Sequence, residues 1–148
     1  AEKAEIGVVS EPLVSLITSK NKKINIIFDI NDEWNKATNN IPLAQTALIV
    51  NSNFAKNYPK LTNAFLESYK TSSLWLTNNA NLAAKLVIKH NILPDTSVAR
   101  KSIQHSNIKF EYAYEMQKSI NEYLNVFYLM NNKIIGGRIP DENFYYKK

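Results

Sequence analysis

The chain has 148 residues, of which 45% are hydrophobic and 21% are charged, and it contains no cysteine. This length is enough for one core that buries roughly two thirds of the extended chain's surface. The missing cysteine excludes disulfides, thiolate metal sites and cysteine nucleophiles. The formal net charge is +5, but the basic residues are scattered rather than grouped with aromatic residues, so we expect no nucleic-acid partner.

Three apolar segments in the first third of the chain predict β-strands, at about residues 5–10, 23–29 and 46–51. The first ends at Ser10-Glu11-Pro12, where proline favours the start of a helix. The third is apolar throughout, which indicates burial on both faces. Three strands are too few to complete a covered parallel sheet, so we predict an α/β chain that is part of a larger protein or pairs with another copy.

Between the second and third strands, residues 30–42 are polar and predict a loop that carries Trp34, with a turn at Asn39 and Asn40. Helices are predicted for most of the chain after the third strand. Asn53 is a candidate cap for a short turn, and Pro59 begins a long helix. Further apolar stripes at helical spacing lie at residues 82–90, 98–103 and 113–127, before a break at Gly136-Gly137 and an aromatic tail that is expected to dock.

Ser10 and Glu11 are the best candidates for ligand contact. They lie at the carboxyl end of a predicted strand and the start of a predicted helix, where open α/β sheets bind ligands. The serine hydroxyl is a donor, and the Glu11 carboxylate is an acceptor for an amine or hydroxyl group. An alternative for Glu11 is a purely structural role as a helix cap. Trp34 is a candidate for stacking on a ligand, and packing onto the sheet is its alternative.

No metal site, cofactor or catalytic activity is expected. The acidic residues Asp29, Asp32 and Glu33 lack the ligand spacing and the glycine of a calcium loop. His90 and His105 have no metal-ligand partner at helical spacing. Neither a nucleophile elbow, a phosphate loop nor a GxGxxG motif is present, and no pair of groups forms a convincing general acid and base.

Several stretches resemble, in order, the solute-binding proteins of ABC importers in the nitrate, sulfonate, taurine and thiamine-precursor group. The first is Ile-Gly-Val-Val-Ser-Glu-Pro, which ends at Pro12, and the next is the Asp-to-Trp segment that ends at Trp34. A Pro-Leu-Ala stretch and a stretch that ends at Pro59 follow. The last is the Gly-Gly-Arg-Ile-Pro-Asp-Glu-Asn-Phe-Tyr-Tyr tail that ends at Tyr146. The resemblance covers nearly the whole chain.

This resemblance implies the C-terminal portion of a two-lobed type II periplasmic-binding-protein fold. Residues 1–45 would end lobe two, residues 46–58 would form a hinge crossing, and residues 59–148 would complete lobe one. The implied ligand contacts are Ser10 and Glu11, with Trp34 and Gln45 lining the cleft.

The implied function is an extracytoplasmic solute receptor, in the periplasm or anchored as a lipoprotein, that closes on a small molecule and delivers it to the membrane permease. Its implied partners are the permease subunits and either an N-terminal half of the same protein or a second copy. Two alternatives stay open: a thiamine-pyrimidine biosynthetic enzyme of the same superfamily and a ligand-sensing module of a signalling protein.

Overall fold

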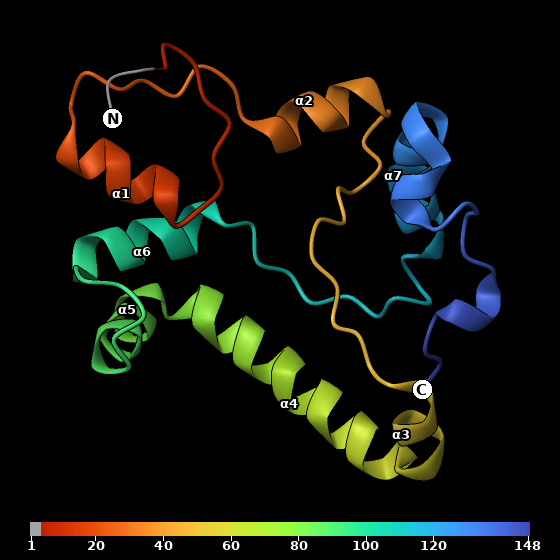
Figure 1. Cartoon of the computed structure of the whole chain (residues 1–148). Helices are drawn as coiled ribbons and strands as arrows, with labels where there is room; N and C mark the ends of the chain where they lie inside the picture. The colour runs from red at the N-terminus through yellow and green to blue at the C-terminus, as the bar shows by residue number, and fades with distance from the viewer. Residues whose placement is uncertain (1–3) are drawn as a thin grey trace. The chain divides into compact units, whose positions relative to one another are not determined.

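The computed structural model describes residues 4–148 and is built from helices joined by irregular segments (Figure 1). About 58% of the described residues are helical, and none of them forms a strand. The helices are α1 (Leu13–Lys20), α2 (Ile30–Ala37), α3 (Ser52–Asn57), α4 (Pro59–Asn78), α5 (Ala80–Lys89), α6 (Thr96–His105) and α7 (Gln117–Asn131), with the short 3-10 helices η1 (Asn132–Ile135) and η2 (Glu142–Phe144). Within residues 4–148, no helix is both long enough and apolar enough to span a bilayer.

The predicted α/β class and the two-lobed type II periplasmic-binding-protein fold are wrong, because that fold requires a multi-stranded sheet. The segments predicted as strands are irregular, and their apolar side chains face solvent: Val8 is 82%, Ile27 is 64% and Ile49 is 89% exposed. Strand preference describes how a side chain fits a pleated, half-buried surface, not an intrinsic property of the backbone. Without neighbouring strands among the described residues, these apolar runs have no ladder to join.

The chain divides into two compact units, each made of two separate stretches of sequence. Unit 1 contains residues 4–26 and Ser68–Phe110, and unit 2 contains Ile27–Glu67 and Glu111–Lys148. Helix α4 therefore contributes its first half to unit 2 and its second half to unit 1. The resemblance implied a different division of the chain, into residues 1–45, 46–58 and 59–148. That division stays a prediction.

Unit 1 is organised around the contact between α5 and α6, and α1 also packs on α6. Its buried core consists of Ala83 and Ala84 on α5 and Ala99 and Ile103 on α6. Small side chains at these positions allow the two helices to approach closely. The Asp95 carboxylate caps α6 by accepting a hydrogen bond from the Val98 amide at 2.9 Å. The predicted short helix through Val98 and Ile103 is confirmed.

Unit 2 is held together mainly by aromatic side chains that also form hydrogen bonds. The predicted docking of the aromatic tail is confirmed, because Tyr145 is only 4% exposed and its hydroxyl donates to Asn121 Oδ1 on α7 at 2.5 Å. The Tyr146 hydroxyl donates to Asn63 Oδ1 on α4 at 2.9 Å. The predicted break at the glycine pair is confirmed too, since Gly136 ends η1 with a left-handed backbone (φ 78°).

Local signals placed most helices correctly but missed one. Pro59 begins α4 as predicted, and Asn39 and Asn40 form the predicted turn with positive φ angles. The predicted polar loop is wrong over Ile30–Ala37, which is helix α2. Asp29 caps this helix by accepting from the Asn31 amide at 2.8 Å. A polar segment with a cap of this kind forms a helix without a broad apolar face.

Candidate functional site

Glu11 lies at the centre of a small polar cluster in unit 1, where α1 packs on α6. Its Oε1 atom accepts a hydrogen bond from the Ser15 hydroxyl at 3.0 Å, and its Oε2 atom accepts from the Ser15 amide at 3.2 Å. His105 Nδ1, near the end of α6, lies 3.6 Å from Glu11 Oε1. The Glu11 side chain is 12% exposed, whereas the His105 side chain is 60% exposed. The cluster is therefore a nearly buried carboxylate beside an imidazole that solvent reaches.

This geometry shows that Glu11 has the structural role that the sequence left open. Its bond to the Ser15 amide caps an otherwise unsatisfied N–H group in the first turn of α1. Ser10 contributes its backbone carbonyl, which accepts hydrogen bonds from the Leu13 and Val14 amides at 3.0 and 3.2 Å. The Ser10 side chain is exposed. Ligand contact by Ser10 and Glu11 stays a prediction.

The chemistry available at the cluster is hydrogen bonding and charge. When Nδ1 of His105 carries a proton, that N–H points toward the carboxylate, and Nε2 is left to interact with solvent or a ligand. A neutral imidazole then presents an acceptor, and a protonated one presents a second donor. The Ser15 hydroxyl, in contrast, belongs to a residue that is only 3% exposed, and it already donates to Glu11. This arrangement suits binding of a polar group better than a nucleophilic serine.

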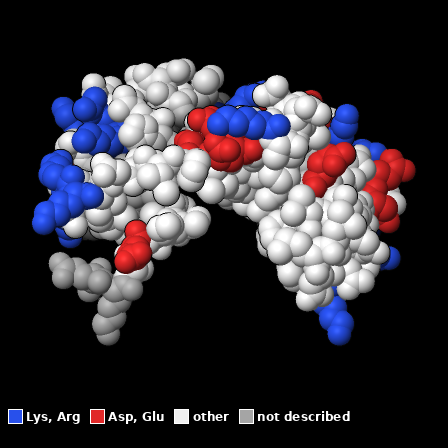
Figure 2. Space-filling model, turned by 90° about the horizontal axis from the view of Figure 1, so that it is seen from above, with Lys and Arg blue, Asp and Glu red and all other residues white. Residues whose placement is uncertain are grey.

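The charged side chains form separate small groups on the face drawn in Figure 2, with uncharged surface between them. No continuous basic stripe crosses the described part of that face.

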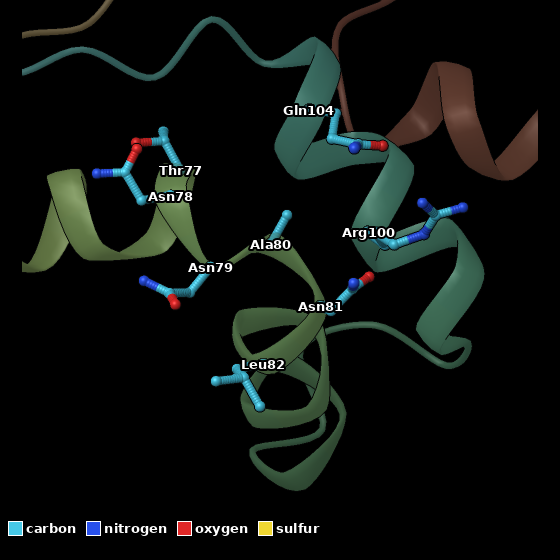
Figure 3. A pocket seen from close by; sticks show the side chains of 8 residues that line it. All are labelled: Thr77, Asn78, Asn79, Ala80, Asn81, Leu82, Arg100 and Gln104. Atoms are coloured by element: carbon cyan, nitrogen blue, oxygen red, sulfur yellow. The ribbon is translucent and has the colours of Figure 1, made fainter.

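A shallow polar cavity of about 420 Å³ also lies in unit 1 (Figure 3). Figure 3 shows that the end of α4 and the start of α5 form one side of it and that α6 forms the other. Its lining consists of Thr77, Asn78, Asn79, Ala80, Asn81, Leu82, Arg100 and Gln104. Arg100 is the charged member of this set, and Gln104 and the asparagines add amide donors and acceptors. Gln104 is the sequence neighbour of His105, so α6 contributes to both the cavity and the Glu11 cluster.

The other two predicted contacts, Trp34 and Gln45, lie in unit 2. The indole N–H of Trp34 donates to the Ile41 carbonyl at 2.8 Å, and its ring lies edge-on to Tyr123 with 5.7 Å between the ring centres. Trp34 therefore packs α2 against α7. Gln45 is exposed in the irregular segment before α3. Ser10 and Glu11 lie in one turn of unit 1, whereas Trp34 and Gln45 belong to unit 2.

Two tyrosines and two charged groups form a further cluster in unit 2. The Tyr112 hydroxyl donates to Glu67, and Lys148 Nζ lies 2.5 Å from the same carboxylate oxygen, Oε1. The hydrogen bond to Glu67 raises the pKa of the Tyr112 phenol. The Tyr112 ring stacks on Tyr114 with 5.7 Å between centres. Among the described residues, no three histidine, aspartate or glutamate side chains lie close enough together to hold a metal ion.

Sequence reasoning missed Ser15, Arg100 and Gln104, and it weighed His105 only as a metal ligand. Ser15 follows Glu11 by one helical turn, and this spacing was available as a signal for a capping bond. Arg100 and Gln104 are also one turn apart, so a shared face was readable once α6 was placed. His105 is far from Glu11 along the chain, and only the packing of α1 on α6 brings the two together.

Comparison with known proteins found no matching family model, no matching curated protein and no matching solved structure.

Proposed function

We propose that this chain belongs to the solute-binding component of an ABC importer and that its unit 1 contacts a small polar solute. The ordered resemblance along the chain supports this function, whereas the described residues do not form the multi-stranded sheet that the family's fold requires. The observation that carries the proposal is the placement of α6, whose Arg100 and Gln104 line a polar cavity while His105 lies beside Glu11. The proposed role is binding and not catalysis.

An anionic group is the solute feature that this lining fits best. Arg100 supplies a planar set of donors that matches a carboxylate, sulfonate or phosphate. The neighbouring asparagines and Gln104 supply further hydrogen bonds for the rest of the molecule. Delivery to a permease, closure of the receptor around the solute and an extracytoplasmic location are the remaining parts of the proposal.

Ligand identification and titration test this proposal. Native mass spectrometry of the gently purified chain would reveal a retained solute, and calorimetry with small carboxylates, sulfonates and phosphates would measure its affinity. Arg100→Ala is expected to weaken binding about tenfold or more, since a charged hydrogen bond contributes about 1.5–3 kcal/mol. Arg138→Ala is the matched control, because Arg138 is exposed in unit 2 and lies outside the cavity.

Two results would contradict the proposal. One is the absence of binding by every anionic solute in the panel together with no retained molecule. The other is an equal loss of affinity in Arg100→Ala and Arg138→Ala, which would show that general positive charge and not the cavity is responsible. Glu11→Gln separates the cluster from the cavity: a change in affinity would place the solute near His105, and no change would leave it at Arg100.

A further inference from the structure

The end of α4 gives the polar cavity of unit 1 a side that accepts hydrogen bonds. Thr77 and Asn79 both line this cavity. The Thr77 hydroxyl directs its single proton to the backbone of its own helix, where the Ser73 and Leu74 carbonyls lie at 3.3 and 3.1 Å. The Asn79 Nδ2 group donates to the Trp75 carbonyl at 2.9 Å. Thr77 Oγ1 and Asn79 Oδ1 therefore offer acceptor lone pairs.

The Asn79 oxygen is not used by the helix that follows it. Asn79 occupies the N-cap position of α5, where an asparagine oxygen commonly accepts from a backbone amide of the first turn. Within the described part of the chain, its side chain makes no such capping bond. The Oδ1 atom is therefore available to a donor on a solute in the cavity.

The opposite side of the cavity, on α6, donates hydrogen bonds. Arg100 lies there, on a different helix from Thr77 (Figure 3). A guanidinium group has five N–H donors and no acceptor. Over residues 4–148, the Arg100 guanidinium has no ion-pair partner. The cavity thus presents a positively charged donor on one side and neutral acceptors on the other.

This division of donors and acceptors selects among anionic solutes. A bare anion has only lone pairs, so it is satisfied by Arg100 but meets the lone pairs of Thr77 Oγ1 and Asn79 Oδ1 without a proton between them. A hydroxyl group supplies that proton. An ammonium group would also supply one, but the lining contains no aspartate or glutamate to balance its charge. The lining also has no aromatic side chain on which a planar ring would stack.

We propose that the solute is a polyhydroxylated monocarboxylate, a sugar acid, whose carboxylate binds Arg100 and whose hydroxyl groups donate to Thr77 Oγ1 and Asn79 Oδ1. This inference rests on the proposed function, because it specifies the class of solute that the same cavity binds. The single cationic side chain of the lining matches a single carboxylate. The volume of about 420 Å³ lies within the usual range of small-molecule sites, roughly 300–1,000 Å³.

Calorimetry of the full chain with four matched six-carbon solutes tests this inference. Gluconate carries both the carboxylate and the hydroxyl groups. Hexanoate lacks the hydroxyl groups, sorbitol lacks the carboxylate, and aminohexanoate has an ammonium group in place of the hydroxyls. Gluconate is expected to bind about tenfold or more tightly than each of the other three, because only gluconate satisfies both sides of the cavity.

The outcomes separate this inference from the proposed function. Equal affinities for hexanoate and gluconate would overturn the hydroxyl contacts and leave the binding of an anionic solute standing. Tighter binding of aminohexanoate would overturn them in favour of an ammonium group. Equal affinities for sorbitol and gluconate would overturn the carboxylate contact with Arg100. If no anionic solute binds at all, the proposed function fails and this inference fails with it.

A matched pair of threonine variants then tests the accepting side. Thr77→Val removes the oxygen at nearly constant shape, so it is expected to weaken gluconate binding about threefold to tenfold and to leave hexanoate binding unchanged. Thr18→Val is the control, because the Thr18 hydroxyl makes the same kind of bond within α1, to the Val14 carbonyl at 2.8 Å, and lies outside the cavity. Equal effects of the two variants on gluconate, or an equal loss of both solutes in Thr77→Val, would contradict the assignment.

Discussion

The two units of this chain contain helices of similar kinds but are stabilised by different interactions. Unit 1 has a core of small apolar side chains, with Ala84 and Ala99 completely buried between α5 and α6. Unit 2 has few buried side chains, and hydrogen bonds from Tyr145, Tyr146 and Trp34 join its separate segments. The stability of unit 1 depends on close packing of apolar side chains. The stability of unit 2 depends on polar groups, some of which titrate and all of which can form hydrogen bonds with water instead. The units should therefore fail under different perturbations.

The largest effect is expected from enlarging the core of unit 1. Ala99→Leu adds three carbons at a fully buried position on α6 and is expected to cost about 2–3 kcal/mol, because overpacking forces the helices apart. Hydrogen exchange of the amides in α6 and α7 would measure the loss of stability in unit 1 and in unit 2, respectively. Lys101→Leu, an exposed position on the same helix, is the control and should change stability little. Equal loss of protection in α6 and α7 would contradict independent stabilisation.

An intermediate effect is expected from Tyr145 in unit 2. Burial raises the pKa of its phenol above the ordinary value of 10.0. A raised folded-state pKa means that the folded protein favours the neutral phenol. Its contribution is therefore complete below about pH 10 and is lost as the pH rises through the folded-state pKa. Tyr145→Phe removes the hydroxyl and should cost about 1 kcal/mol of stability at neutral pH. It should also make the free energy of unfolding fall less steeply as the pH rises above about 10.

Urea denaturation between pH 8 and pH 11 would measure this behaviour. Trp75→Phe leaves Trp34 as the fluorescent reporter of unit 2, because each unit contains one tryptophan. Tyr128→Phe, on the same unit but 37% exposed, is the control. If Tyr145→Phe and the parent chain lost stability equally between pH 8 and pH 11, the assignment of the alkaline transition to Tyr145 would be wrong.

The smallest effect is expected at the cap of α6. Asp95→Ala removes the acceptor for the Val98 amide and is expected to cost about 1 kcal/mol, whereas Asp95→Asn keeps an acceptor and should cost less. Asp141→Ala makes the matching change in unit 2, where Asp141 caps η2, a helix of three residues. Thermal unfolding should be affected more by Asp95→Ala than by Asp141→Ala. The reverse order would mean that the tail and not α6 limits stability.

The helices were predictable where local signals decide them. Pro59, the apolar stripe at residues 98–103 and the Gly136-Gly137 break are each signals within a few residues of sequence, and each prediction is confirmed. The three strand predictions failed because apolar residues such as Ile27 and Ile49 favour burial in a sequence without specifying any surface that would bury them, and both side chains are exposed. The helix α2 was missed because most of its residues are polar; the Asp29 cap and the packing of Trp34 on Tyr123 both favour it.

The candidate site was predictable only in part. Ser10 and Glu11 were identified from their place before Pro12, and the Glu11 bonds to Ser15 follow from helical spacing. The approach of His105 to Glu11 depends on the packing of two helices that are far apart in sequence. No local pattern contains that information. For Trp34 the predicted alternative was packing onto a sheet, but the structure packs it against Tyr123 of α7 instead, and its contact with a ligand stays a prediction.

The interleaved units have a consequence for how the chain folds during synthesis. All of unit 1 has been synthesised once Phe110 has left the ribosome, but unit 2 needs Tyr145 and Tyr146 to reach Asn121 and Asn63. At roughly 5–20 residues per second, the first half of α4 must wait several seconds for the tail, because Asn63 accepts its hydrogen bond from Tyr146. During that interval the exposed apolar side chains of unit 2 are accessible to chaperones, so unit 2 sets the window in which the nascent chain is most vulnerable.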